Sequence, residues 1–193
     1  MKLTLLVSGG LDSTVLVHHA LRSVSASDIT AVTVRYGQPH EKELQFAKEL
    51  CSTIGIAHEI VSSYPWNTVP DPVRANDIPW SPKKGDPMEI RGRNSLFVCL
   101  AYIVAECDEI WLGANEDDQR DYPDCRVSWA NNMSKLFGVK VVLPLSWWTK
   151  REVVAMARHY GVDLEMTLSC YRGKVPSCGE CNACVLRNGA MQT

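Results

Sequence analysis

Long hydrophobic runs are absent from this sequence of 193 residues, and none approaches the roughly 20 apolar residues that cross a bilayer. An excess of charge is absent too, because 20 Lys and Arg residues face 22 Asp and Glu residues, for a formal net charge of -2. Without a basic tail, the chain lacks the electrostatic signature of a duplex-binding protein. Low-complexity tracts are also missing, and 46% of the residues are hydrophobic, so the composition is globular and excludes disorder.

The beginning of the chain lacks the features of a secretory signal. The apolar stretch Met1–Val7 is too short for a signal-peptide core and has no small-residue cleavage site, so export is not expected. The length suits one hydrophobic core and is short for two full domains. We therefore expect a soluble cytoplasmic protein with a single main domain.

Half of the eight cysteines crowd into one short stretch near the end of the chain, with the spacing C-x7-C-x2-C-x2-C. Clustered cysteines in a reducing compartment favour metal binding over disulfides, and four thiolates would close a structural zinc site. A redox C-x-x-C pair, a disulfide and an iron–sulfur cluster are the alternatives. The predicted zinc ligands are Cys170, Cys178, Cys181 and Cys184.

Apolar periodicity predicts strands that alternate with helices. Expected strands are Leu3–Val7, Ile29–Val34, Ile56–Val61, Glu109–Ala114 and Val139–Leu143. Expected helices are Ser13–Leu21, Pro39–Gly55, Asn94–Cys107, Ser128–Phe137 and Thr149–Tyr160. This alternation predicts an α/β fold, a doubly wound parallel sheet covered on both faces. We expect a main domain at residues 1–165 and a small zinc-binding segment at 166–193, packed on the same domain.

Ligands of such sheets bind beyond the carboxyl ends of the strands. The polar loops expected to converge there are Ser8–Ser13, Tyr36–His40, Asn115–Arg126 and Pro144–Lys150. Within the third of these, the charged stretch Asn115–Asp124 is expected to be a loop. The region Ser62–Arg91 contains six prolines and no sustained periodicity. We interpret it as a lid or a partner-facing loop, with a featureless insertion as the alternative.

A glycine-rich segment follows the first strand and opens a helix. Its glycines let the backbone approach an anion, its hydroxyls add donors, and the helix N-terminus adds partial positive charge. It lacks the Lys of the G-x-x-x-x-G-K-[ST] loop and the spacing of G-x-G-x-x-G. SGG-x-DS resembles the pyrophosphate loop (PP-loop) of the ATP pyrophosphatases. The predicted ATP-binding residues are Ser8, Gly9, Gly10, Leu11, Asp12, Ser13 and Thr14.

Further motifs appear in a fixed order along the chain. They are YGQPH from Tyr36, GRN from Gly92, YPDCR from Tyr122, Lys150, SCY from Ser169 and the CGECNAC cluster. With the glycine-rich loop, these motifs make the chain similar to the 7-cyano-7-deazaguanine synthases of the queuosine pathway, from about Leu3 to Arg187. The resemblance implies the adenine nucleotide alpha hydrolase-like fold of PP-loop enzymes, and a homodimer.

The resemblance also implies a reaction. An ATP-dependent C–N ligase would adenylate 7-carboxy-7-deazaguanine, replace AMP with ammonia to give an amide, and activate the amide again to give the nitrile. ATP, Mg²⁺ and structural Zn²⁺ are the implied cofactors, and no nucleic-acid or membrane partner is expected. Asp12 at an anion site fits either a contact with Mg²⁺ or a role in organising the loop.

The same resemblance assigns roles within the site. Lys150 and Arg93 would stabilise charge on the phosphates, and Asp118 and His40 are candidate bases for ammonia. The predicted substrate-binding residues are Tyr36, Gln38, Asn94, Tyr122, Asp124 and Arg126.

Structural roles are the alternatives for several of these residues. Lys150 would then cap a helix on the surface, and Asp124 and Arg126 would pair with each other. His40, Arg93 and Asp118 would be ordinary loop polar groups.

The chain also departs from the family pattern near the site. Examples are Leu11 in place of Gln, Pro39 in place of Arg, and Arg91 in place of Pro. These changes leave open an enzyme that stops at the amide, and a PP-loop enzyme that modifies tRNA is a further alternative.

Overall fold

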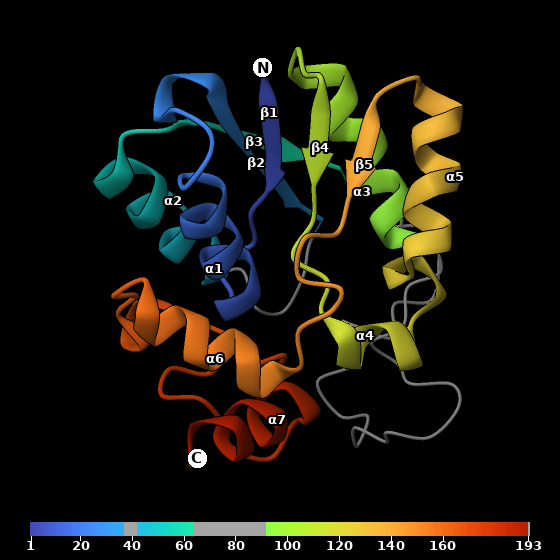
Figure 1. Ribbon diagram of the computed structural model, residues 1–193. Helices are drawn as coiled ribbons and strands as arrows, with labels where there is room; N and C mark the ends of the chain where they lie inside the picture. The colour runs from blue at the N-terminus through green and yellow to red at the C-terminus, as the bar shows by residue number, and fades with distance from the viewer. Residues whose placement is uncertain (37–41, 64–91, 193) are drawn as a thin grey trace.

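A five-stranded parallel sheet forms the centre of the computed structural model, which describes residues 1–36, 42–63 and 92–192. The strand order is β3-β2-β1-β4-β5, so the chain starts in the middle of the sheet and builds outward on each side (Figure 1). Leu3 of β1 is in register with Ile29 of β2 and Glu109 of β4. The strands are β1 (Leu3–Leu6), β2 (Ile29–Arg35), β3 (Ala57–Ser62), β4 (Glu109–Trp111) and β5 (Lys140–Val142).

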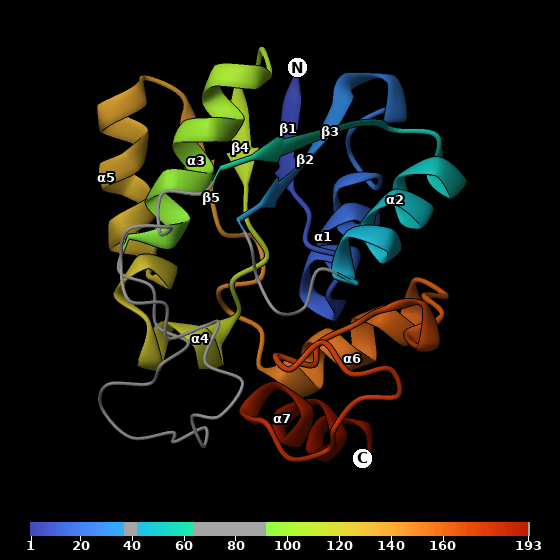
Figure 2. The same ribbon diagram turned by 180° about the vertical axis from the view of Figure 1, so that it is seen from behind.

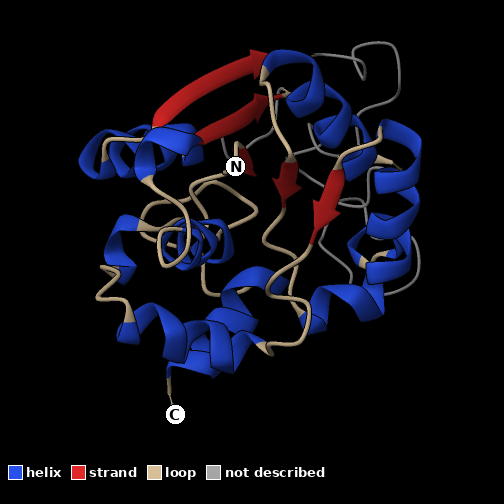
Figure 3. Ribbon diagram, turned by 45° about the horizontal axis from the view of Figure 1, so that its top comes forward, coloured by secondary structure: helices blue, strands red, loops and turns tan. Residues whose placement is uncertain are grey.

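Helices cover both faces of this sheet, as expected for parallel strands joined by crossovers (Figures 2 and 3). Their bounds are α1 (Leu11–Ala20), α2 (Glu43–Ile54), α3 (Arg93–Val104), α4 (Glu116–Asp121), α5 (Val127–Phe137), α6 (Lys150–His159) and α7 (Asn182–Met191). Short 3-10 turns lie at Ala26–Asp28, Pro123–Cys125 and Leu164–Met166.

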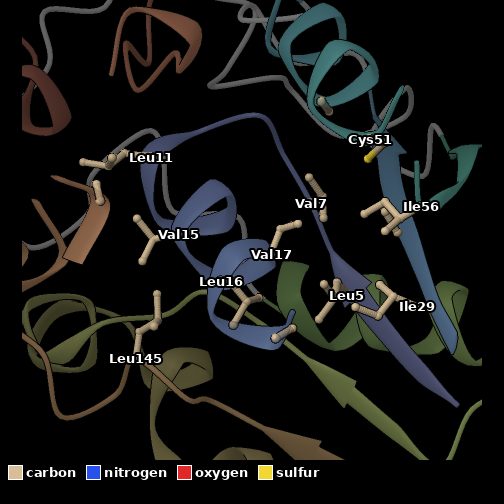
Figure 4. Packing of buried hydrophobic residues seen from close by; sticks show 14 of the residues in the cluster. Leu5, Val7, Leu11, Val15, Leu16, Val17, Ile29, Cys51, Ile56 and Leu145 are labelled. Atoms are coloured by element: carbon tan, nitrogen blue, oxygen red, sulfur yellow. The ribbon is translucent and has the colours of Figure 1, made fainter. Parts of the chain in front are cut away.

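The sheet separates two hydrophobic clusters because successive side chains of a strand point to opposite faces. On one face, Leu3 and Leu5 of β1 are buried with residues of α1, α2 and α6. On the other face, Val32 and Ile110 are buried with residues of α3 and α5. Figure 4 shows Leu5 and Ile29 beside Leu16 and Val17 of α1, all of which are essentially inaccessible to solvent. This packing fixes α1, and with it the loop that precedes α1.

The predicted α/β fold is confirmed, and the elements agree with the predicted ones to within a few residues at most ends. The largest difference concerns Asn115–Asp124, where a loop was expected and α4 and a 3-10 turn are found. A capping box explains the helix: Asn115 accepts from the Asp118 N–H at 3.1 Å, and Asp118 accepts from the Asn115 N–H at 3.1 Å. Acidic residues in its first turn also suit the positive end of the helix dipole.

Two further differences lie outside the main sheet. Helix α7 occupies the cysteine-rich end, where no helix is predicted from the sequence. The expected lid over Ser62–Arg91 falls almost wholly on residues 64–91, outside the described residues, and so does the start of the helix expected from Pro39. Among the described residues, no helix is long and apolar enough to cross a membrane.

Candidate active site

A cavity of about 550 Å³ lies beyond the carboxyl ends of β1, β2 and β4. This is the position where the order of a doubly wound sheet reverses and where such folds bind ligands. The helices α4, α6 and α7 lie beyond the same ends of the strands (Figure 1). Among the predicted site residues, the cavity wall includes Ser8, Gly10, Asp12, Ser13, Tyr36, Arg93, Asn94, Asp118, Tyr122, Asp124 and Lys150.

The glycine-rich loop joins β1 to α1 at the floor of this cavity. Gly9 has φ +88°, and a Cβ there would lie against the carbonyl oxygen of Glu43 and 2.8 Å from the Ala47 nitrogen. Only glycine therefore fits at this position. The Ser13 hydroxyl donates to the Gly10 carbonyl at 3.1 Å and accepts from the Ser8 N–H at 3.2 Å, which holds the turn open at the start of α1.

An ion pair stands at the start of α1. Lys150 Nζ, from the first residue of α6, lies 2.7 Å from Oδ1 and 2.6 Å from Oδ2 of Asp12. Asn115 donates its side-chain N–H to Asp12 Oδ1 at 3.0 Å. Burial alone would lower the pKa of Lys150, but the charges of Asp12 and Asp118 raise it, so the amine stays protonated. Lys150 is thus a partly buried cation of the cavity wall rather than a surface helix cap.

Asp118 adds a second carboxyl group near this pair. Burial, and then the negative charge of Asp12, raise the pKa of Asp118 to about 6. The Lys150 charge and the hydrogen bond from Asn115 act in the opposite direction. A carboxyl group with such a pKa exchanges its proton near neutral pH, which is what a general base or acid needs.

Arg93 and Asn94 open α3 on another side of the cavity. Arg93 donates to the Tyr36 hydroxyl at 3.3 Å. Asn94 donates its backbone N–H to Asp124 Oδ2 and its side-chain N–H to the Asp124 carbonyl, both at 3.1 Å. Asp124 therefore holds the start of α3, and the YPDCR segment is fixed to GRN.

Among the described candidates for ATP and substrate binding, Gly9, Leu11, Thr14 and Arg126 do not line the cavity. Leu11 is fully buried in the hydrophobic cluster around α1. Arg126 lies on the surface. Its side chain is exposed, donates to the Gln119 carbonyl at 3.1 Å and does not contribute to the cavity wall. Among the described residues it makes no ion pair with Asp124. Gln38 and His40 lie outside the described residues.

The four clustered cysteines converge as predicted, with their Sγ atoms all within 4.8 Å of one another. Cys178 and Cys184 approach to 3.8 Å, which matches the roughly 3.8 Å between thiolates bound tetrahedrally at about 2.3 Å from zinc. Although partial burial acts the other way, hydrogen bonds from the Cys181 and Glu180 N–H groups lower the pKa of Cys178 to about 6. The donor set and its spacing fit a metal ion such as zinc.

The cysteine segment also contacts the cavity and the main sheet domain. Leu168 donates its N–H to the Gly9 carbonyl at 3.1 Å, and Tyr171 is part of the cavity wall. Buried Arg187 of α7 donates to the Thr167 carbonyl at 3.0 Å and to the Ser169 hydroxyl at 3.2 Å. The segment therefore contributes to the wall of the site and also carries the four cysteines that could hold a metal ion.

Sequence reasoning missed four side chains that build or support this site. No sequence pattern near Asn115 or Glu43 indicates a role in the site, because their partners lie far along the chain. Tyr171 stood in a quoted motif without a role, and the buried environment of Arg187 depends on tertiary packing. The four are Glu43, Asn115, Tyr171 and Arg187.

Comparison with known proteins shows the family to which the chain belongs. The sequence matches the family described as "Queuosine biosynthesis protein QueC" over residues 2–193. The chain belongs to the QueC family. A 7-cyano-7-deazaguanine synthase of Thermoplasma acidophilum is 31% identical over 205 residues, covering 96% of this chain and 85% of the relative. The synthase of Alteromonas mediterranea is also 31% identical, covering 92% of this chain and 87% of the relative.

Solved structures of more distant proteins share the QueC chain's fold. NMN synthetase from Francisella tularensis superposes with a TM-score of 0.60 at 17% identity, covering 94% of this chain and 70% of that one. The U34-tRNA thiolase NcsA from Methanococcus maripaludis superposes with a TM-score of 0.53 at 18% identity, covering 100% and 71%. These likenesses confirm the PP-loop type of fold, and the family membership makes the chain an enzyme.

Proposed function

We propose that this QueC family enzyme converts 7-carboxy-7-deazaguanine and ammonia to 7-cyano-7-deazaguanine with ATP. A carboxylate oxygen attacks the α-phosphorus, pyrophosphate leaves, and ammonia then displaces AMP from the acyl carbon to give the amide. A second ATP adenylates the amide oxygen, and loss of AMP and protons gives the nitrile. The observation that carries the proposal is the cavity that unites the glycine-rich loop with a partly buried lysine and an acid of raised pKa.

The loop Ser8–Thr14 is proposed to hold the ATP phosphates. The N-terminus of α1 carries partial positive charge toward the cavity, and Gly9 and Gly10 let the backbone approach an anion closely. Gly113, two residues after the end of β4, supports this arrangement, since a Cβ there would lie 3.1 Å from the carbonyl carbon of Asp12.

The two cations of the wall have separate proposed tasks. Lys150 sits at the start of α1 and would stabilise charge that gathers on the α-phosphate as pyrophosphate leaves. Arg93, beside Tyr36, would serve the acyl side of the reaction. Asp118, with its pKa of about 6, would take the proton from ammonium or from attacking ammonia. The part proposed for His40 rests on the sequence motif alone.

Mg²⁺ and zinc are proposed as the metals. The Asp12 carboxylate is a hard oxygen donor that suits Mg²⁺, which takes one or two carboxylates beside phosphate oxygens and, when bound, neutralises phosphate charge. In the structure Asp12 organises Lys150, so both expected roles of this carboxylate are compatible with its position. The thiolates of Cys170, Cys178, Cys181 and Cys184 would hold zinc as a structural ion.

Substrate contacts are proposed for the aromatic and polar groups of the remaining wall. Tyr36 and Tyr122 line the cavity beside Asn94 and Asp124, whose mutual hydrogen bonds keep the wall in place. Arg126 is exposed outside the cavity wall, so its proposed contact with the substrate requires its loop to move. Gln38 is retained from the motif.

Product analysis tests the proposal. Purified protein with 7-carboxy-7-deazaguanine, ammonium and Mg-ATP should give AMP, pyrophosphate and nitrile, with two AMP per nitrile. Mass spectrometry that finds only amide would reduce the enzyme to an amide synthase. No AMP release with this substrate would refute the assignment. A salt-sensitive, saturable affinity for tRNA would favour the tRNA-modifying alternative.

A further inference from the structure

One carboxyl group of the cavity wall, that of Glu43, has no role in the proposed chemistry. Glu43 is the first residue of α2, is only 8% exposed and lines the cavity. Its backbone packs directly on the glycine-rich loop, because the carbonyl oxygen of Glu43 is the atom that a Cβ on Gly9 would strike. A carboxyl group is thus buried inside the ligand site, on a different element from the Asp12–Lys150 pair.

The surroundings of Glu43 favour a ligand that is flat and offers hydrogen-bond donors. The rings of Tyr36 and Phe97 lie 5.3 Å apart between centroids, and both line the cavity. The Arg93 guanidinium lies 5.9 Å from the Tyr36 ring centroid. Aromatic faces and a guanidinium plane are surfaces on which heterocyclic bases stack.

The electrostatics of Glu43 follow from the same neighbours. Burial raises the pKa of Glu43 well above its ordinary value, and the positive charge of Arg93 opposes this shift. Ligand N–H groups that donate to the carboxyl group would favour its ionised form and offset the cost of its burial. Each carboxylate offers two oxygens with about four lone-pair positions, so Glu43 can serve a protein neighbour and a ligand together.

We propose that the Glu43 carboxylate reads the guanine edge of the substrate, accepting hydrogen bonds from its ring N1–H and its exocyclic amino group. The inference rests on the proposed function, because it takes a deazaguanine as the substrate. The two donors are adjacent on the ring and match the two oxygens of a carboxylate. The aromatic pair Tyr36 and Phe97 would hold the ring plane next to Arg93.

This contact would let one cavity distinguish between two similar rings. The reaction brings adenine and a deazaguanine into the same site, and their edges differ in polarity. Adenine presents a ring nitrogen acceptor where guanine presents the N1–H donor, so a carboxylate attracts one edge and repels the other. Glu43 therefore specifies which ring binds as the carboxylic acid substrate and which binds as the adenine of ATP.

The test is a binding cycle between the carboxylate and the exocyclic amino group. Calorimetric titration would measure Kd for 7-cyano-7-deazaguanine and for its 2-desamino analogue, with the wild-type enzyme and E43Q. We expect the wild type to bind the analogue about 30-fold more weakly, because a charge-assisted hydrogen bond is lost and the carboxylate is left short of a donor. In E43Q this gap should shrink to about threefold or less.

Controls separate recognition from folding. Glu49→Gln makes the same change at an exposed residue of the same helix, and it should keep the wild-type gap. A structural role alone would weaken both ligands equally and preserve the gap, which would overturn the inference. Should E43Q not fold, Glu43→Asp retains the charge but withdraws it by one methylene. An unchanged gap in E43D, or equal affinities of the wild type for the two ligands, would also overturn it.

Turnover distinguishes failure of the inference from failure of the proposed function. In steady-state assays E43Q should raise KM for the deazaguanine acid about 30-fold and leave KM for ATP within about twofold. A larger effect on KM for ATP would place Glu43 at the nucleotide and overturn the inference. A wild type that shows the binding gap but releases no AMP would refute the proposed reaction while the recognition of the guanine edge stands.

Discussion

The helices α1 and α6 both begin at the cavity, but side chains cap the N-terminus of α6 and not that of α1. Helix α6 is fully capped: Thr149 and Glu152 form a capping box, and Asp117 accepts the Lys150 N–H at 2.9 Å. Helix α1 begins after Gly10 and has no side-chain cap hydrogen bond. Its first-turn hydroxyls of Ser13 and Thr14 instead donate backward to the Gly10 carbonyl, at 3.1 and 2.9 Å.

This difference separates two uses of a helix start. Every helix leaves its first N–H groups without intrahelical partners, and a cap satisfies them at the cost of their ability to bind a ligand. Capping of α6 fixes the backbone of Lys150 and aims its amine at Asp12. The start of α1 keeps its amides and its partial charge for an anion. One helix thus supplies a placed side chain, and the other supplies its backbone.

Removing the amine that α6 places is expected to have the largest effect. Lys150→Met keeps the apolar stem but deletes the charge, and kcat/KM for AMP release should fall by roughly 10³, as for other losses of a preorganised electrostatic group. The matched control is Arg151→Met, an exposed cation one residue along the same helix. A decrease of less than about tenfold with intact folding would show that Lys150 is structural.

The next largest effect is expected from a substitution of Gly9, in the loop that precedes α1. Gly9 and Gly55 both have positive φ, at +88° and +78°, but a Cβ meets Glu43 and Ala47 only at Gly9. Gly55→Ala should therefore cost about 1 kcal/mol of unfolding free energy from the left-handed conformation alone. Gly9→Ala adds overlap with the backbone of α2 and should cost about 3 kcal/mol or more. Urea denaturation of both variants measures the difference, and equal losses would contradict the close packing of α2 on the loop.

Giving α1 a side-chain cap like that of α6 should weaken ATP binding without destabilising the protein. Gly10 has φ -78° and ψ 166°, the extended conformation of an N-cap, so Gly10→Asp can cap the helix. The introduced carboxylate would occupy the phosphate position and repel the phosphates of ATP. KM for ATP should therefore rise about 30-fold, with little change in the free energy of unfolding. Gly10→Ala controls for the added Cβ, which would lie 3.2 Å from Ser8 Oγ. An unchanged KM for ATP in Gly10→Asp would place the phosphates elsewhere.

Asp118, in the first turn of α4, is expected to set a pH dependence. Because burial and Asp12 raise the pKa of Asp118 to about 6, its carboxylate is present above pH 6 and becomes protonated below. As a base it would be lost in acid, so kcat/KM for the amide step should fall about tenfold per pH unit below pH 6. The profile should be measured at a constant concentration of unprotonated ammonia. Asp118→Asn should remove this acid limb, whereas the exposed Asp121→Asn should retain it.

Sequence reasoning reached the parts of this site that are encoded locally. The glycine-rich loop and the cysteine cluster each occupy a short stretch, and their function depends on neighbours within about a dozen residues. Lys150 was found through the motif order, but its pairing with Asp12, 138 residues away, belongs to the tertiary structure. Glu43 and Asn115 acquire their meaning only when α2 and α4 are packed against the loop.

The prediction of a loop at Asn115–Asp124 was wrong because the local pattern does not indicate the helix found there. A run of acidic residues with few apolar ones lacks the periodicity on which helix prediction rests. Its helix is held instead by the reciprocal cap of Asn115 and Asp118 and by the Arg120–Glu116 ion pair at 3.1 Å. Asparagine followed by an acidic residue three positions later is a weaker form of the capping box. This pattern was the signal that could have predicted the start of α4.

Loosening the cap of α6 should have the smallest effect and complete the contrast with Gly10→Asp. Thr149→Ala removes the hydroxyl that accepts from the Glu152 N–H at 3.3 Å, and should cost about 1 kcal/mol of unfolding free energy. Asp117 still accepts the Lys150 N–H, so the amine should keep its position and KM for ATP should change less than about twofold. Denaturation and steady-state kinetics on one preparation measure both quantities. A loss of ATP affinity without a loss of stability would mean that the start of α6, like that of α1, serves the ligand directly.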